Sequence, residues 1–326
     1  MDRFVISTRA VVGNKFVAEP GSTRFLMVPQ GQTLQPAHEI SRRDVWVKRL
    51  RKACSWGKDS RVPTRERGDI LIFIHGYNND QNIVMARYDR LTQDLADVGY
   101  KGSVVAFDWP SENMAMNYLE DRHDAKQTAM QLVTDGIACL SAEQTPDCAI
   151  NIHLLGHSTG AYVIREAFDD ADDTRLPNSA WTISQIALIG ADVSCASMSE
   201  GNSSTDSLYR HCTRLTNYSS LFDSALKLSN AKRLGTAPRA GRVGLPADAP
   251  SKAVNVECTD YFEALNKDAT IKSRDQAAEI GSFDHSWHIG NKVFARDLFE
   301  TLRGDMDRTV IPTRRQDSQG KLHLIG

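Results

Sequence analysis

Gly156-His157-Ser158-Thr159-Gly160 is a G-x-S-x-G pentapeptide that follows an apolar run, residues 149–155, and precedes a helical pattern, residues 161–168. Many G-x-S-x-G stretches are plain turns, but a strand before the motif and a helix after it are typical of a nucleophile elbow. The turn of an elbow is so tight that its serine is strained, and the positions two residues away carry glycine. The stretch therefore predicts that Ser158 lies at the end of a strand with its hydroxyl lifted above the sheet edge.

The composition of the chain is that of an ordinary globular protein. Of 326 residues, 41% are hydrophobic and 25% are charged, and the formal net charge of −2 gives no indication of a nucleic-acid partner. No apolar run approaches the ~18 residues of a membrane span, and residues 1–7 show no secretory signal. We therefore expect a cytoplasmic protein. Its 6 cysteines are widely spaced, which favours free thiols and gives no indication of a metal site.

Apolar strand patterns alternate with amphipathic helical patterns on both sides of the motif. The strand patterns are residues 69–76, 103–109, 149–155, 181–190 and 212–219, and the helical patterns are residues 82–98, 118–140, 160–170 and 289–302. This alternation predicts an α/β fold with a doubly wound, mostly parallel central sheet and helices on both faces. Sheets of this kind bind ligands beyond the carboxyl ends of their strands.

We expect residues 1–304 to form a single domain. Residues 1–48 hold short extended patterns, which predict extra strands at one edge of the sheet. Residues 51–68 are expected to form a surface connection. Residues 196–252 are rich in turn-forming residues and predict loops that either cover the site as a lid or lie on the surface. Residues 305–326 are expected to be a polar, loosely packed tail.

A serine hydroxyl becomes a useful nucleophile when a base accepts its proton and a carboxylate orients that base. In enzymes with this elbow, the carboxylate and then the histidine follow the serine along the chain. His285 lies in a loop before the last helical pattern, where the base is expected. His288, three residues later, is the second choice, and His211 precedes the strand that should carry the acid. Each could instead be an ordinary surface imidazole.

Two carboxylates follow strand patterns at the predicted ligand-binding edge. Asp223 comes after the strand pattern at residues 212–219, and Asp192 comes after the one at residues 181–190. Position alone favours Asp223 and leaves both open, because Asp223 could cap a helix and Asp192 could close a loop.

Acyl transfer also requires two backbone N–H groups that stabilise the negative charge on the reacting oxygen, the oxyanion hole. One is expected from Thr159, directly after the nucleophile. The other is expected from Tyr77, after the strand that ends in His75-Gly76, where glycine allows a close approach of the backbone. The side chains of Asn78 and Asn79 are suited to bracing this loop.

Four residues are candidates for contact with a substrate. Trp109 ends a strand pattern, and Met114 and Met116 follow it. The three would line an apolar pocket, although tryptophan and methionine more often fill a protein core. His157, directly before the nucleophile, is the fourth. We take Trp109 and His157 as the first choices.

Taken together, these segments resemble an uncharacterised bacterial group of α/β-hydrolases known as a domain of unknown function, DUF900. The resemblance spans roughly residues 65–303 and is carried by Phe73-Ile74-His75-Gly76-Tyr77-Asn78, Phe107-Asp108-Trp109-Pro110-Ser111, residues 154–160, Tyr218-Ser219-Ser220 with Asp223, and His285-Ser286-Trp287. The group more often has methionine where this chain has Thr159. The resemblance implies the α/β-hydrolase fold and a serine hydrolase that uses Ser158, His285 and Asp223. It implies no particular substrate.

The sequence therefore predicts a serine hydrolase that cleaves carboxylic esters, as carboxylesterases and lipases do, through an acyl-enzyme. Its substrate would be a small-molecule or lipid ester, and no metal or organic cofactor is expected. An amidase or peptidase with the same three residues is an alternative, and so is a non-catalytic binding module on the same scaffold. Composition and motifs give no oligomeric state.

Overall fold

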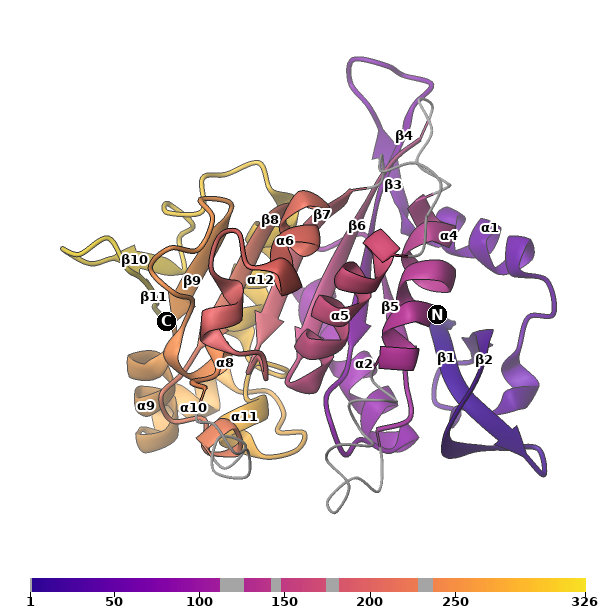
Figure 1. Cartoon of the computed structure of the whole chain (residues 1–326), viewed down its shortest axis with the longest axis horizontal. Helices are drawn as coiled ribbons and strands as arrows, with labels where there is room; N and C mark the ends of the chain where they lie inside the picture. Colours follow the sequence, from indigo (N-terminus) through magenta and orange to yellow (C-terminus); the bar gives the residue numbers. More distant parts are fainter. Residues whose placement is uncertain (1, 112–125, 142–147, 174–181, 228–236) are drawn as a thin grey trace.

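The computed structural model describes residues 2–111, 126–141, 148–173, 182–227 and 237–326. Its strands are β1 (Arg3–Val12), β2 (Lys15–Val28), β3 (Ser55–Lys58), β4 (Glu66–Ile74), β5 (Ser103–Asp108), β6 (Cys148–His157), β7 (Ile183–Ile189), β8 (Cys212–Ser219), β9 (Ala253–Glu257), β10 (Arg314–Gln316) and β11 (Leu322–Leu324). Its helices are η1 (Pro36–His38), α1 (Arg43–Cys54), α2 (Gln81–Asp97), η2 (Leu132–Ile137), α4 (Ala138–Ser141), α5 (Thr159–Asp173), η3 (Cys195–Met198), α6 (Ser203–Arg210), α8 (Ala240–Val243), α9 (Thr259–Lys267), α10 (Ala269–Asp275), α11 (Phe283–Ser286) and α12 (Lys292–Arg303). Within these ranges the strands form one sheet with helices packed on both faces (Figure 1).

The sheet has 11 strands in the order β10-β11-β9-β8-β7-β6-β4-β5-β1-β2, and β3 pairs with β4 off this path. Neighbours from β11 to β1 run parallel, whereas β2, β3 and β10 are antiparallel to their partners. The predictions of a doubly wound, mostly parallel sheet and of extra N-terminal strands are confirmed. After β5 the chain returns to place β6 on the other side of β4, which creates the switch point where such sheets bind ligands.

The two faces of the sheet bury alternate residues of each central strand. Ile70, Ile72 and Ile74 of β4 pack in one cluster with α1 and α5, and Leu71 and Phe73 pack in the other with α2 and α12. Successive side chains of a strand point to opposite faces, so a strand covered on both sides is apolar throughout. The continuous apolar run seen in the sequence follows from this double burial.

Two helices contradict the sequence prediction. The stretch that contains α1 was expected to be extended or a surface connection, yet α1 buries Trp46 and Leu50 against the sheet. The stretch that contains α6 was expected to be a loop, yet the Asn202 side chain caps this helix and Leu208 and Tyr209 are buried. Both segments have few apolar residues among many polar ones, so packing against the rest of the chain, and not the local pattern, stabilises them.

The structure also bears on the helix predicted at residues 118–140, on membrane spans and on the cysteines. Residues 126–141 are helical, with a π-helical stretch at η2, and the earlier part of the pattern at 118–140 lies outside the described residues. None of the helices in the described ranges is long and apolar enough to cross a membrane. Cys195 and Cys212 are free thiols, as predicted.

The segment after Gly304 is not the loosely packed tail that its polar composition predicts. It returns to the sheet, where β11 pairs with β9, and it buries the side chain of Arg314. The Arg314 guanidinium binds both carboxylate oxygens of Asp297, at 2.6 and 2.9 Å, and both side chains are fully buried. Burial alone would lower the pKa of Arg314, but the paired Asp297 carboxylate raises it above the usual value. The polar residues of this segment are therefore paired with the core and not solvated.

Replacing Asp297 with alanine should lower the free energy of unfolding by about 3–5 kcal/mol, because Arg314 would be left as a buried charge without its partner. Urea unfolding of the purified proteins measures this effect. Asp206→Ala is the matched control, since Asp206 pairs with Arg210 at the surface and its loss should cost less than about 1 kcal/mol. Equal losses for the two variants would contradict the proposed importance of the buried pair.

Candidate active site

The G-x-S-x-G stretch forms the strained turn that the sequence predicts. β6 ends at His157, α5 begins at Thr159, and Ser158 between them has a positive φ of 56°. A Cβ atom on Gly156 would lie 2.7 Å from Ile164 Cδ1, and one on Gly160 would collide with the carbonyl oxygen of Ile74. Both positions therefore require glycine. The backbone N–H groups of the first turn of α5, which include that of Thr159, have no partner within the helix and suit a negative charge beside Ser158.

His285 and Asp223 form a buried pair. His285 Nδ1 lies 2.7 Å from Asp223 Oδ2, and the side chains are 10% and 2% exposed. Because a carboxylate oxygen accepts, the Nδ1–H of the imidazole donates, which leaves Nε2 available to take up a proton. The other oxygen of Asp223 accepts a hydrogen bond from the backbone N–H of Leu226 at 2.9 Å. The carboxylate is thus fixed on both sides.

The end of β7 brings this pair next to the strained serine. The Ser158 N–H donates to the carbonyl of Ile189 at 3.0 Å. A Cβ on the next residue, Gly190, would lie 3.0 Å from Cε1 of His285 and 3.3 Å from Oδ2 of Asp223. Glycine at 190 leaves room for both side chains. The structure therefore brings three predicted residues, from the ends of β6 and β8 and from α11, to one edge of the sheet.

The alternatives that the sequence left open lie elsewhere. Asp192 pairs with Arg239 at 3.1 Å, whereas it is Asp223 that pairs with His285. The ring of His288 is buried between the rings of Trp287 and Phe294. His211 ends α6 at the amino end of β8, the edge of the sheet opposite to Ser158. Geometry therefore favours Asp223 and His285 among the candidates.

The loop after β4 lies against the serine. A Cβ on Gly76 would lie 2.7 Å from Cβ of Ser158, so only glycine fits there. The Asn79 side chain donates to the carbonyl oxygens of Gly76 at 2.7 Å and of Tyr77 at 3.0 Å. Asn78 has a positive φ of 53°, and its N–H donates to the carbonyl of Ser111 at 2.7 Å. These bonds fix the backbone around Tyr77, which directly follows Gly76.

Trp109 lies beneath this loop and not in a substrate pocket. It is 1% exposed, its indole N–H donates to the His75 carbonyl at 2.9 Å, and its backbone N–H donates to His75 Nε2 at 3.2 Å. His75 in turn donates from Nδ1 to the carbonyl of Gly76 at 2.8 Å. The prediction that Trp109 contacts substrate is therefore corrected to the alternative of a core residue, because the motif showed its proximity to the site but not its burial. Met114 and Met116 lie outside the described residues.

A buried ion pair supports the same loop from the N-terminal strand. Arg9 of β1 binds Asp108 at 2.8 Å, and its Nη2 donates to the carbonyl of Asn79 at 3.1 Å. Both charged side chains are almost fully buried. The sequence analysis did not identify Arg9. Its signal was a charged residue within a strand, and a buried charge is rare unless it is paired.

His157 contacts protein groups through both ring nitrogens. Its Nδ1 lies 3.1 Å from Nη1 of Arg87, and its Nε2 lies 3.2 Å from the carbonyl oxygen of His285. The ring is 1% exposed. These contacts leave no ring nitrogen for a substrate, so the geometry gives His157 a structural role in place of the predicted substrate contact. Arg87 was also missed by the sequence analysis, since its partners are far away along the chain.

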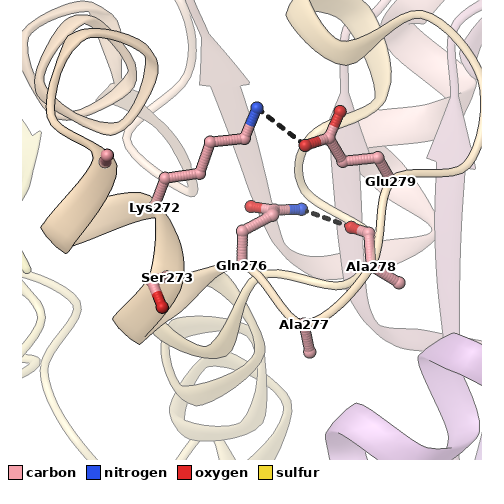
Figure 2. Close-up of a pocket in the computed structure, with 7 residues that line it drawn as sticks. Lys272, Ser273, Gln276, Ala277, Ala278 and Glu279 are labelled. Carbon is pink, nitrogen blue, oxygen red and sulfur yellow. Dashed lines mark hydrogen bonds and ion pairs between the residues drawn. The ribbon is translucent and has the colours of Figure 1, made fainter.

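A surface pocket lies beside α10 (Figure 2). Its lining residues are Ala269, Lys272, Ser273, Gln276, Ala277, Ala278 and Glu279. Lys272 pairs with Glu279 at 2.7 Å, and the Gln276 amide donates to the carbonyl of Ala278 at 2.7 Å. None of the candidate catalytic residues lines this pocket, so we do not assign it to the reaction. In the described part of the chain, no group of three or more His, Cys, Asp or Glu residues is arranged to hold a metal ion.

Comparison with known proteins identifies the family of this chain. A family model described as "Alpha/beta hydrolase of unknown function (DUF900)" matches residues 56–262. The matched range includes Tyr77, Ser158 and Asp223 and ends before His285. No curated protein matches the sequence.

Several solved structures share distant similarity with the chain. A dienelactone hydrolase from Anabaena variabilis ATCC 29413 is 13% identical, with 84% of this chain and 93% of that chain covered and a TM-score of 0.35. A metagenomic carboxyl esterase is 14% identical, with 77% and 78% covered and a TM-score of 0.33. Esterase B from Lactobacillus rhamnosis is 12% identical, with 50% and 58% covered and a TM-score of 0.30. Similarities this low carry no argument about the chemistry of this chain.

Three buried histidines should make the protein less stable in acid. Burial holds the pKa of His75, His157 and His288 below the ordinary value, and neither ring nitrogen of His288 has a hydrogen-bond partner among the described residues. Below about pH 6.5 these histidines bind protons in the unfolded chain but stay neutral in the folded protein. The free energy of unfolding therefore decreases as the pH decreases. Each such histidine contributes up to about 1.4 kcal/mol per pH unit.

His288→Phe removes one of these groups and replaces a buried polar ring with an apolar one. We expect the variant to match or exceed the parent in stability at pH 7, because an unpaired buried polar group is lost. As the pH falls from 6 to 5, the variant should lose less unfolding free energy than the parent. The difference should be up to about 1.4 kcal/mol per pH unit. Urea unfolding at a series of pH values measures both quantities. Parallel pH profiles for variant and parent would contradict this expectation.

Proposed function

Since the chain belongs to the α/β-hydrolase family of unknown function DUF900, we propose that it hydrolyses carboxylic esters through an acyl-enzyme formed on Ser158. One observation carries the proposal: a buried pair with His285 Nδ1 2.7 Å from Asp223 Oδ2 lies beside a serine held at a positive φ of 56°. Such a serine, base and carboxylate are the three groups that nucleophilic acyl transfer requires.

In the proposed reaction, Nε2 of His285 accepts the proton of Ser158 while Oγ attacks the ester carbonyl carbon. The backbone N–H groups of Tyr77 and Thr159 stabilise the negative charge on the carbonyl oxygen. When the intermediate collapses, the imidazolium gives its proton to the leaving alcohol, and the acyl group stays on Oγ. Asp223 holds the imidazole in the tautomer with Nδ1–H and stabilises its protonated form.

Water completes the cycle by the same steps. His285 accepts a proton from water, the hydroxide attacks the acyl carbon, and the imidazolium returns the proton to Oγ of Ser158 as the acid leaves. Leu221 and Phe222, on the turn that leads to Asp223, are 52% and 43% exposed. These exposed apolar side chains, directly before Asp223 in the chain, are our reason for proposing an ester with an apolar acyl group, either a small molecule or a lipid.

Replacing Ser158 with alanine should lower ester turnover by about 10⁴-fold or more, because no acyl-enzyme can form. A series of p-nitrophenyl esters of increasing acyl length measures turnover and chain preference together. A fluorophosphonate probe should label the parent protein and not the variant. Ser203→Ala, at an exposed serine in α6, is the matched control and should retain both properties.

The possible results separate the rival functions. Parent-like turnover by the Ser158→Ala protein would reject the proposal. Labelling of Ser158 together with cleavage of anilides but not of esters would indicate an amidase. A folded parent protein that neither reacts with the probe nor cleaves any substrate would indicate a binding module.

The identity of the acid has its own test. Asp223→Asn should lower kcat by about 10³–10⁴-fold, because an amide no longer favours the productive tautomer of His285. Asp192→Asn leaves Arg239 without its partner, so it should lower stability but change kcat less than about 10-fold. Steady-state kinetics and thermal unfolding of both variants measure these effects. A large loss of kcat in Asp192→Asn alone would reverse the assignment.

A further inference from the structure

Arg87 of α2 is a buried arginine with an unusual set of partners. It is 4% exposed, and burial lowers its pKa to about 10. The buried arginines Arg9 and Arg314 each bind a carboxylate, whereas no carboxylate pairs with Arg87 among the residues that the structure describes. Its contacts are instead with His157 at 3.1 Å, the hydroxyl of Ser286 at 3.0 Å and the carbonyl of Ile280 at 3.2 Å. Its partners are all neutral, and its buried Nε has no hydrogen-bond partner among the described residues, so this charge requires an explanation.

The contact with Arg87 determines the protonation of His157. An arginine can donate hydrogen bonds but not accept them, so Nδ1 of His157 carries no proton. The neutral ring therefore carries its proton on Nε2, which donates to the backbone carbonyl of His285 at 3.2 Å. Burial, and then the positive charge of Arg87, holds the pKa of His157 well below its usual value, which is consistent with this neutral form.

This hydrogen bond joins the elbow to the segment that carries the base. His157 directly precedes Ser158, and its ring centroid lies 4.8 Å from that of His285. Arg87 also binds the chain on both sides of His285, at Ile280 and at Ser286. These two residues and His157 are the acceptors for one guanidinium group.

The segment around His285 folds closely about this guanidinium. Gly281 has a positive φ of 93°, and a Cβ atom there would lie 2.5 Å from Nη2 of Arg87. α11, which contains His285, has 4 residues. A helix of this length has little stability of its own, so its position depends on contacts with the rest of the protein.

We propose that Arg87 is a positioning residue for the base: through His157 and Ser286 it fixes the backbone of His285 so that the imidazole faces Ser158. This inference rests on the proposed function. Arg87 is too buried to touch a substrate and acts only through its neighbours. A misplacement of a reacting group by about 1 Å can cost about 10²-fold in rate, which sets the size of the expected effect. Lysine cannot replace it fully, because one ammonium group does not reproduce the hydrogen bonds that the two Nη groups of Arg87 make to three acceptors.

Arg87→Met and Arg87→Lys test the proposal, with Arg90→Met as the matched control on the same helix. Arg90 pairs with Asp94 at 2.7 Å, so its loss disturbs α2 without removing a contact to His157 or Ser286. The measured quantities are the second-order rate constant for fluorophosphonate labelling, kcat and KM on a short-chain p-nitrophenyl ester, and the midpoint of thermal unfolding. Labelling depends on the base but not on substrate binding, so it reports the alignment of His285 directly.

We expect Arg87→Met to lower the labelling rate constant and kcat by about 10²-fold while KM changes by less than about 3-fold. Arg87→Lys should recover about 10-fold of that loss, and Arg90→Met should stay within about 3-fold of the parent in both rates. Labelling of folded Arg87→Met at the parent rate would overturn the inference. So would an equal loss in Arg90→Met, since that loss would come from α2 in general.

If Arg87→Met does not fold, Ser286→Ala and His157→Phe provide the test, since each removes one acceptor and leaves the arginine in place. Both should lower the labelling rate constant by about 10-fold or more in folded protein. Parent rates in both variants would overturn the inference. Ser158→Ala separates the two hypotheses: its loss of activity beside unaffected Arg87 variants rejects only the positioning role, whereas its retention of activity rejects the proposed function itself.

Discussion

Close approach of backbone segments at the carboxyl edge of the sheet is the constraint on which this site depends. Ser158 has a positive φ, and the surrounding chain comes so near that a Cβ atom would be crowded at Gly76, Gly156 and Gly160. Gly190 leaves room for the side chains of His285 and Asp223. Each of these glycines lies at the end of a strand or in the first turn of a helix. The close packing of these strand ends therefore sets the place of Ser158, the proposed nucleophile.

Buried charged groups then fix the loops that meet the nucleophile. The pair of Arg9 and Asp108 supports the loop that carries Tyr77, and Arg87 supports the segment that carries His285. The pair of Asp297 and Arg314 likewise fixes the C-terminal segment, whose strand β11 pairs with β9. Loops at a sheet edge have few apolar contacts of their own. Buried hydrogen bonds with fixed directions can hold them in one geometry where apolar packing would allow several.

The sequence predicted those features that local order determines. The choice of Ser158 follows from a five-residue motif in its strand-to-helix context, and that of His285 from the order in which such residues occur after the elbow. Order left Asp223 and Asp192 both open, and the resemblance to the family favoured Asp223. The doubly wound sheet follows from the alternation of apolar strands and helices. In each case the information lies within a few residues, or in the order of a few such segments.

The features that the sequence missed depend on contacts between distant parts of the chain. Arg87 is 70 residues from His157 and 199 from Ser286, so no local pattern marks it. Trp109 was misjudged because its motif shows that it is near the site but not that it is buried. α1, α6 and the C-terminal strands are polar segments whose few buried groups find partners elsewhere in the fold.

His285, the proposed base, is held at two points by two different kinds of group. Asp223 binds the imidazole of His285 and so fixes its tautomer and its rotation, whereas His157 binds the backbone carbonyl and so fixes where the side chain starts. The contact with Asp223 alone would not fix the backbone of His285, and the contact with His157 alone would not fix the rotation of its ring. This division also gives a reason for a neutral ring at position 157. A protonated His157 would set a second buried charge beside Arg87 and would oppose the imidazolium that His285 must form in the proposed reaction.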